Sequence, residues 1–138
     1  MKTTTLIKNL VLGISVLAAG ANAMASSSKL SPIQTLQMQD DKGQIGVLVS
    51  GLSLYTFDPD NGAAQPACNA TCAEKWPPVL VENENEIRGN DRLGIIVRAS
   101  GLKQVTVDGK PVYTFYLDRQ LGDVKGDGLG NVWHLVGL

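Results

Sequence analysis

We expect a mainly β fold from three observations in this 138-residue chain. A motif containing Tyr55-Thr-Phe57 recurs 58 residues later around Tyr113-Thr-Phe115, which indicates a duplicated structural unit. Short runs with strand-like alternation surround both copies, and turn signals separate these runs. Asp108-Gly109 is a strong signal of this kind, because a type I′ hairpin turn needs positive φ at both central residues.

Each copy of the repeat predicts a three-stranded antiparallel meander. The six strands are expected at residues 33–39, 44–49, 53–57, 93–98, 103–107 and 111–116. A single meander has two open edges and one unburied face, so two copies must pack together for stability. We therefore expect a pseudo-two-fold β-sandwich or a partly open barrel, and the strand pattern leaves both closures open.

A short helix and a polar connector are expected between the two meanders. Pro66, the following alanines and the stop at Pro77-Pro78 predict one short helix around Cys68–Trp76. In such a helix Cys68, Cys72 and Trp76 would lie on one face. Residues 81–92 carry three glutamates and are expected to be an acidic connector between repeats at 33–80 and 93–136.

The N-terminal residues indicate export. Lys2 and Lys8 accompany an apolar stretch that ends before Ala21-Asn22-Ala23, so residues 1–23 are expected to be a cleaved signal peptide. Residues 24–32 form the expected flexible leader, and residues 33–138 a single domain. The competing interpretation is an uncleaved membrane anchor, but the apolar stretch is short for a bilayer.

The mature chain is expected to be a soluble periplasmic or secreted protein without a transmembrane span. No Cys stands directly after the apolar stretch, so we expect no lipid anchor. Loss of Lys2 and Lys8 reduces the 12 basic residues to ten, against 13 acidic residues, which gives a net charge of −3. No basic run remains, which argues against nucleic acid or anionic membranes as partners.

Cys68 and Cys72 are the two cysteines of the chain, and an oxidising compartment favours a disulfide between them. At helical spacing their Cα atoms lie about 6 Å apart, within the range that a disulfide tolerates. The alternative is a redox-active dithiol, although such pairs usually have a two-residue spacer and a depressed thiolate pKa.

The repeated motif supplies the other candidate site residues: Tyr55, Phe57, Asp60, Tyr113, Phe115 and Asp118. Tyr and Phe at positions i and i+2 share one face of a strand. We expect all seven aromatic rings of the chain, which also include Trp76, Tyr116 and Trp133, to fill the core, with an aromatic ligand cage as the alternative. Asp60 and Asp118 come shortly after the predicted strands and are expected to accept hydrogen bonds from turn N–H groups. The functional alternative places both carboxylates in one cleft for acid–base work.

No cofactor or metal site can be assembled from the remaining residues. The aspartates around Asp58 and Asp123 lack the complete ligand pattern of a calcium loop. His134 is the single histidine, and we expect it to be a packing residue beside Trp133. A small ligand such as haem, held by Tyr or His, stays an alternative.

The chain resembles the bacterial secreted-repeat or predicted-lipoprotein family, which is marked by a Tyr-x-(Phe/Trp/Tyr)-x-x-Asp motif. Residues 55–60 and 113–118 both fit this motif, and Cys68 to Pro78 is similar to the linker between copies in that family. The resemblance covers roughly residues 40–138 and implies no established biochemical activity. Two departures are the absent lipid-attachment Cys and Ala70, which stands where the family tends to have Gly.

These observations predict an exported, non-enzymatic binding or structural module of the cell envelope, whose partner is an unknown small ligand or envelope protein. The chain shows no pairing of a nucleophile with a base and no cofactor motif. The alternatives are a thiol-disulfide redox protein that uses Cys68 and Cys72, or a binder of haem or a metal.

Overall fold

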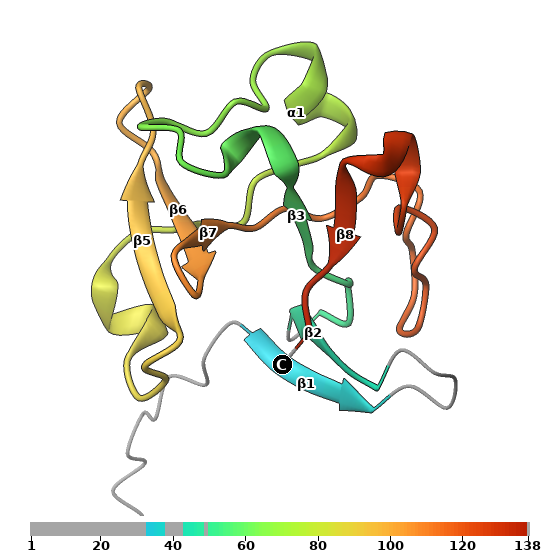
Figure 1. Cartoon of the computed structure of the whole chain (residues 1–138). Helices are drawn as coiled ribbons and strands as arrows, with labels where there is room; N and C mark the ends of the chain where they lie inside the picture. The colour runs from blue at the N-terminus through green and yellow to red at the C-terminus, as the bar shows by residue number, and fades with distance from the viewer. Residues whose placement is uncertain (1–32, 38–42, 49, 138) are drawn as a thin grey trace, which may run out of the picture.

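The computed structural model of the chain describes residues 33–37, 43–48 and 50–137. The expected signal peptide (1–23) and leader (24–32) lie outside these residues. The elements within the described part are β1 (Ile33–Gln37), β2 (Gln44–Leu48), β3 (Tyr55–Phe57), η1 (Asp58–Asp60), α1 (Thr71–Lys75), β4 (Leu80–Val81), η2 (Glu84–Ile87), β5 (Leu93–Val97), β6 (Lys103–Val107), β7 (Lys110–Pro111), η3 (Leu129–Asn131) and β8 (Trp133–Leu135), where η denotes a 3-10 helix. The expectation of a mainly β fold is confirmed (Figure 1).

Both repeats contain adjacent antiparallel strands. In the second repeat β6 pairs with β5 along one edge and with β7 along the other. The turn between β6 and β7 contains Asp108 and Gly109, both with positive φ (50° and 80°), as a type I′ turn requires. In the first repeat β1 pairs with β2, whereas β2 meets the next segment only through a single bridge from Val47 to Ser53.

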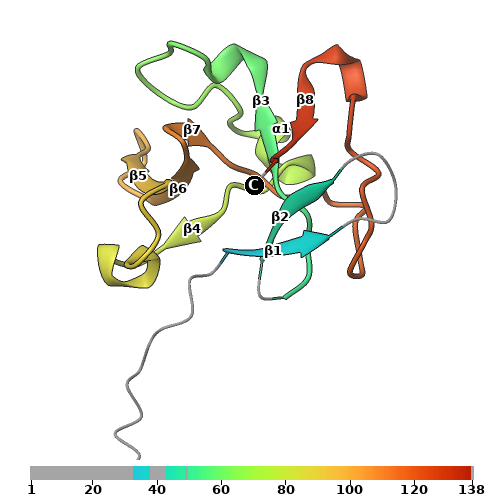
Figure 2. The same cartoon turned by 60° about the horizontal axis from the view of Figure 1, so that its bottom comes forward.

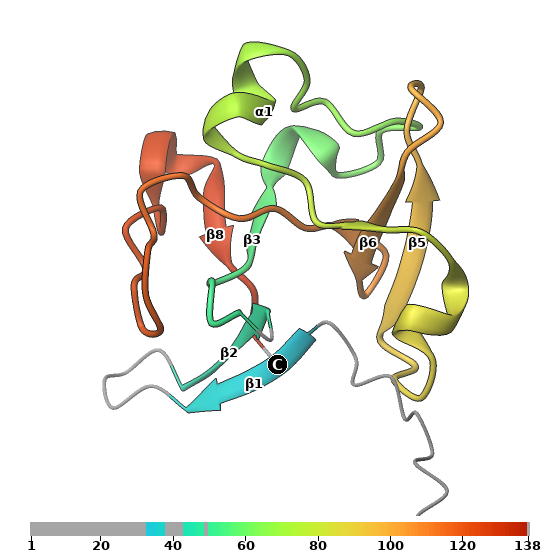
Figure 3. The same ribbon diagram turned by 180° about the vertical axis from the view of Figure 1, so that it is seen from behind.

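The last strand of each repeat pairs with the other repeat, an arrangement that the sequence does not predict. β4 from the first repeat pairs with β6, and β8 from the second repeat pairs with β3. A bridge between Ile45 and Gly137 extends the second contact. β3 and β8 lie side by side in Figures 1 and 3. Because open strand edges carry unpaired backbone groups, the exchanged strands satisfy these groups and join the two halves.

The two repeats are related by a pseudo-two-fold axis that passes between Tyr55 and Tyr113. The N–H of each tyrosine donates to the carbonyl of the other, and both N···O distances are 2.9 Å. The equivalent bonds around them also recur in both halves. Val79 N–H donates to the Val112 carbonyl (3.1 Å), and Val136 N–H donates to the Leu54 carbonyl (2.9 Å).

Three small sheets surround the core. The described strands form two two-stranded sheets and one four-stranded sheet, and these sheets do not close into a barrel. Figure 2 shows β1 and β2 in front of β3. We call the two buried clusters the aliphatic core (Leu54, Val79, Val81, Ile87, Leu93, Val105, Val107, Val112, Val136) and the aromatic core (Tyr55, Cys68, Trp76, Tyr113, Phe115, Trp133).

One short helix lies in the segment between Cys68 and Trp76, but it begins later than expected. α1 starts at Thr71, and Ala70 before it has a positive φ of 48°. This left-handed residue breaks the helical path, so Cys68 lies outside the helix. The expectation that Cys68, Cys72 and Trp76 share one helical face is therefore wrong.

The connector at residues 81–92 is rich in glutamate, but part of it packs into the core. Its η2 helix begins with a capping box, in which the Asn83 side chain accepts from the Asn85 N–H and Glu86 accepts from the Asn83 N–H (3.0 and 3.1 Å). Ile87 at the end of η2 belongs to the aliphatic core. The connector thus contributes to the packing of the second repeat.

Candidate functional site

The repeated tyrosines and aspartates meet across the two repeats. The Tyr55 hydroxyl donates to Asp118 Oδ2 at 2.6 Å, and the Tyr113 hydroxyl donates to Asp60 Oδ2 at 2.7 Å. Each aspartate therefore binds the tyrosine of the other repeat. We call these contacts the Asp118 pair and the Asp60 pair.

The second oxygen of each carboxylate accepts a hydrogen bond from the backbone seven residues further along the chain. Asp60 Oδ1 accepts from the Ala67 N–H at 2.6 Å, and Asp118 Oδ1 accepts from the Lys125 N–H at 3.0 Å. Both aspartates are buried. Each carboxylate thus fixes the loop that follows its own copy of the motif and the tyrosine of the other repeat.

The electrostatic environment keeps both tyrosines neutral. Burial, followed by the hydrogen bond to Asp118, raises the pKa of Tyr55 far above its usual value. Burial and the bond to Asp60 likewise raise the pKa of Tyr113, and this rise is opposed in part by hydrogen bonding from Gln104 and Arg98. Burial also raises the pKa of Asp118, although its bond with Tyr55 acts in the opposite direction. The tyrosines serve as hydrogen-bond donors in this arrangement.

The motif phenylalanines contact the tryptophans in an equally symmetric way. Trp76 and Trp133 stack with centroids 3.7 Å apart and an interplanar angle of 4°. Phe57 packs on Trp133 at 4.2 Å, and Phe115 packs on Trp76 at 4.3 Å. In both halves a tyrosine meets a tryptophan edge-on at 5.3 Å. Six of the seven rings therefore pack in or against the aromatic core, whereas Tyr116 is 47% exposed, so the expectation is wrong for this ring.

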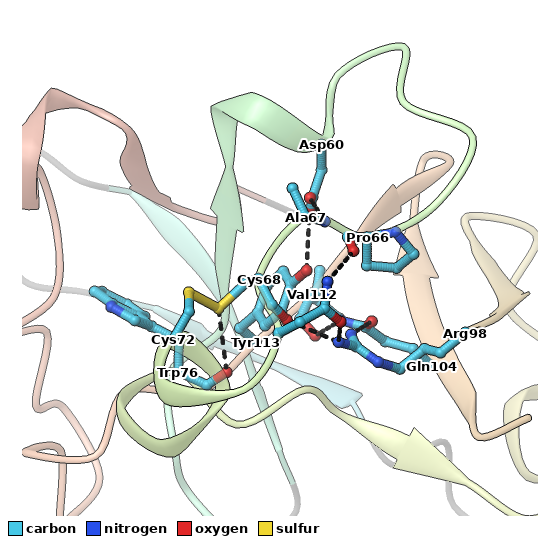
Figure 4. Close-up of a disulfide and its surroundings, with 11 residues drawn as sticks. Asp60, Pro66, Ala67, Cys68, Cys72, Trp76, Arg98, Gln104, Val112 and Tyr113 are labelled. Carbon is cyan, nitrogen blue, oxygen red and sulfur yellow. Dashed lines mark hydrogen bonds between the residues drawn. A yellow bond between two sulfur atoms is a disulfide. The ribbon is translucent and has the colours of Figure 1, made fainter. Parts of the chain in front are cut away.

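Sequence reasoning missed a buried arginine beside the Asp60 pair. Arg98 donates to Gln104 Oε1 (2.5 Å), to the Cys68 carbonyl (2.7 Å) and to Asn69 Oδ1 (2.6 Å), as Figure 4 shows in part. Gln104 is fully buried and donates in turn to the Val112 carbonyl at 2.9 Å. Because arginine is usually exposed, its position at the end of a predicted strand gave no sign of this network.

Cys68 and Cys72 form a disulfide, with Cα atoms 5.2 Å apart (Figure 4). Cys68 is fully buried in the aromatic core, and Cys72 is partly buried. Arg98 holds the carbonyl of Cys68, so the disulfide loop is attached to the Arg98 network. The disulfide therefore forms part of the packed aromatic core.

His134 does not pack in the core, so the expectation for this residue is wrong. Its Nε2 lies 2.9 Å from Asp58 Oδ2, and both side chains are nearly half exposed. Side chains alternate along β8, which directs Trp133 inward and His134 outward. Within residues 33–37, 43–48 and 50–137, no cluster of three or more His, Cys, Asp or Glu side chains suits a metal ion.

A shallow groove of about 390 Å³ lies over the stacked tryptophans, on the side of the second repeat. Three buried rings of the aromatic core, Trp76, Trp133 and Phe115, line it. Tyr116, Leu117 and Leu129 also line it and are 47%, 40% and 43% exposed. We call this feature the aromatic groove; it is lined in full by Lys75, Trp76, Phe115, Tyr116, Leu117, Leu129, Gly130, Val132 and Trp133.

Comparison with protein families gives two matches, both to a family described as a secreted repeat of unknown function. The matched segments are residues 37–80 and 94–137, which together cover more than half of the chain. The chain matches none of the curated proteins and none of the solved structures. Among the described residues, no helix is long and apolar enough to cross a membrane. The chain belongs to the family of secreted repeats of unknown function.

Proposed function

We propose that this protein is an exported, non-catalytic binding module of the cell envelope, and that the aromatic groove binds small apolar anions. Export is supported by the signal peptide expected at residues 1–23 and by the description of the family as secreted. The single observation that carries the binding site is the groove itself, in which partly exposed apolar side chains surround a floor of stacked rings.

A non-catalytic role is supported by the way in which the motif residues are used. Tyr55 and Tyr113 donate their hydroxyl protons to carboxylates, and both oxygens of Asp60 and of Asp118 accept hydrogen bonds. All four side chains are buried. Groups held in this way stabilise the junction of the repeats and are shielded from solvent and from a substrate.

The chemistry of the groove favours an apolar anion. A volume of about 390 Å³ lies in the usual size range of small-ligand sites. Lys75 is the one charged residue among the lining residues, and all the others are aromatic, aliphatic or glycine. A ligand with an aromatic or aliphatic body and one acidic group would place its body against the exposed side chains of Tyr116, Leu117 and Leu129 and its charge beside Lys75.

Anilinonaphthalene sulfonate, a fluorescent aromatic anion, tests this proposal directly. We expect the mature protein to enhance its fluorescence in a saturable titration. Leu129→Asp introduces a like charge into the groove and should raise the dissociation constant by at least about tenfold, since an unpaired charge and a lost apolar contact act together. Leu102→Gln is the matched control, because Leu102 is 51% exposed but lies outside the groove.

The contribution of Lys75 can be separated with an uncharged analogue of the probe. Lys75→Gln should weaken binding of the sulfonate by roughly two- to fivefold, the size of an exposed ion pair, and leave binding of N-phenylnaphthylamine unchanged. Equal binding by the wild type, Leu129→Asp and Leu102→Gln would refute the groove as the site. Two simple assays test the earlier alternatives: rapid reduction of Cys68 and Cys72 by a mild reductant would favour a redox role, and a Soret shift on haem addition would favour haem binding.

A further inference from the structure

The backbone of β5 pairs with β6 through alternate residues. At one end the Asp108 N–H donates to the Arg92 carbonyl (2.7 Å), and at the other end the Arg98 N–H donates to the Leu102 carbonyl (2.8 Å). In an antiparallel pair only every second residue bonds to the neighbouring strand. The even-numbered residues from 92 to 98 therefore face β6, and the odd-numbered residues face away from it.

Leu93, Ile95 and Val97 thus direct their backbone groups to the outer edge of the sheet. Two of these groups are already bonded, since the Leu93 N–H donates to the Asn90 carbonyl (3.0 Å) and the Val97 carbonyl accepts from the Gln65 amide (3.2 Å). The Leu93 C=O, both groups of Ile95 and the Val97 N–H have no partner among the residues that the structure describes. Two donors and two acceptors are therefore available along this edge.

We propose that β5 pairs with β5 of a second copy of this chain, in antiparallel orientation about a two-fold axis at Ile95. In this register the two Ile95 residues face each other and exchange both of their backbone hydrogen bonds. The Val97 N–H of each copy donates to the Leu93 carbonyl of the other. The pairing uses all four available groups of each copy and needs neither group that is already bonded. This self-complementarity is what points to a second copy as the partner.

The side chains of the edge suit such a contact. β5 has the sequence Leu-Gly-Ile-Ile-Val, with no charge and no proline, whereas solvent-exposed edges usually carry one of these to prevent pairing. Val97 is 52% exposed, and it is the side chain of this edge that the contact would cover. A groove of about 400 Å³ lies beside the strand, between Leu93, Gly94 and Ile95 of β5 and six residues of η2 and the connector that include the charged Glu84, Arg88 and Asp91. A contact of one strand is small for a stable interface, so the dimer should be weak and concentration-dependent.

Sedimentation velocity of the mature chain, from roughly 5 to 500 µM, tests the proposal over the range expected for a small interface. We expect a monomer–dimer equilibrium. Val97→Pro removes an outward N–H and an exposed side chain, and edge strands tolerate proline at such positions. It should raise the dissociation constant at least about tenfold, because two of the four intermolecular hydrogen bonds are lost and the ring obstructs pairing. Val97→Thr keeps the N–H and should dimerise nearly as the wild type does.

Amide hydrogen exchange in the wild type provides a second measurement that does not depend on a variant. The Ile95 amide should exchange slowly at high protein concentration and faster on dilution, while the Arg98 amide, bonded within the chain, should not change. A wild type that stays monomeric at the highest concentration would overturn the proposal, as would a dimer with a fast Ile95 amide. The proposal would also be overturned if the protein stayed monomeric and exchange at the Ile95 amide slowed only after an unrelated strand-forming peptide was added. The proposal stands independently of ligand binding in the aromatic groove.

Discussion

The Asp60 pair and the Asp118 pair make the same hydrogen bonds in different surroundings. Beside the Asp60 pair lies the buried Arg98, which binds the carbonyl of Cys68 in the disulfide loop. Beside the Asp118 pair the Gly126 N–H donates to the Tyr55 hydroxyl at 3.2 Å. The Asp60 half is therefore supported by a disulfide and a buried arginine, whereas the Asp118 half is supported by a hydrogen bond from the backbone.

Cys68 and Gly126 stand at equivalent positions, each directly after the residue whose N–H binds the carboxylate. Gly126 lies so close to the aromatic core that a Cβ atom there would be 2.6 Å from a ring carbon of Trp76. The same position thus carries a disulfide in one half and tight ring packing in the other. The motif thus defines the hydrogen bonds, while the loops after it determine which contacts support these bonds.

Loss of Arg98 should disturb the Asp60 half most. Arg98→Met removes the donor to the buried Cys68 carbonyl and Gln104 Oε1, and unsatisfied buried acceptors should lower the free energy of unfolding by about 3 kcal/mol. Urea denaturation measures this loss. Hydrogen exchange should accelerate more at the Ala67 amide, which binds Asp60, than at the Lys125 amide.

Arg92→Met is the control for this variant. Arg92 is exposed and pairs with Asp108 on the surface, so its loss should change the stability far less. Equal effects of the two substitutions, or equal exchange at the Ala67 and Lys125 amides in Arg98→Met, would show that the Arg98 network does not support the Asp60 half in particular.

Gly126→Ala should disturb the Asp118 half, with a somewhat smaller loss. The added Cβ would lie within 3.1 Å of atoms of both Trp76 and Phe115, and overpacking of this kind costs about 1–3 kcal/mol. The Lys125 amide should now exchange faster than the Ala67 amide, the reverse of the order in Arg98→Met. Gly137→Ala is the matched control, because a Cβ at Gly137 meets no atom within 4 Å. A Gly126→Ala protein as stable as Gly137→Ala would contradict the tight packing.

The repeat allowed much of this fold to be predicted, because alternation and turn residues act locally. The β1–β2 and β5–β6 pairings and the Asp108-Gly109 turn follow from such local signals. The exchange of β4 and β8 could not be predicted in this way. A duplicated sequence offers each strand two equivalent neighbours, one in each repeat, and a single sequence does not distinguish them.

The candidate site could also be predicted only in part from the sequence. The spacing placed Asp60 and Asp118 at turns, but it could not indicate that each would bind the tyrosine of the other repeat. The left-handed Ala70 was missed because such a conformation is uncommon for alanine. Arg98 was missed because its burial depends on Cys68 and Gln104, whose positions are fixed only in the folded chain.

The smallest expected effect concerns the dependence of stability on pH in the Asp118 half. Burial raises the pKa of Asp118, so the folded state holds this proton more firmly than the unfolded chain. Its contribution to stability is therefore present below the ordinary aspartate pKa of 3.8 and is lost as the pH rises through the raised value. Asp118→Asn cannot lose a proton, so its deficit relative to the wild type should shrink as the pH rises from about 3 to 7, a range that spans ordinary carboxyl pKa values.

Asp123→Asn provides a control of opposite sign on the same loop. The backbone N–H of Arg119 and that of Gln120 lower the pKa of Asp123, and the charge of Lys125 acts in the same direction. Its contribution is present above the ordinary pKa and is lost as the pH falls, so the deficit of Asp123→Asn should grow as the pH rises. Urea denaturation of the two variants and the wild type across this range measures both slopes. If the deficits of the two variants changed with pH in the same direction, Asp118 would not hold its proton more firmly in the folded state than in the unfolded chain.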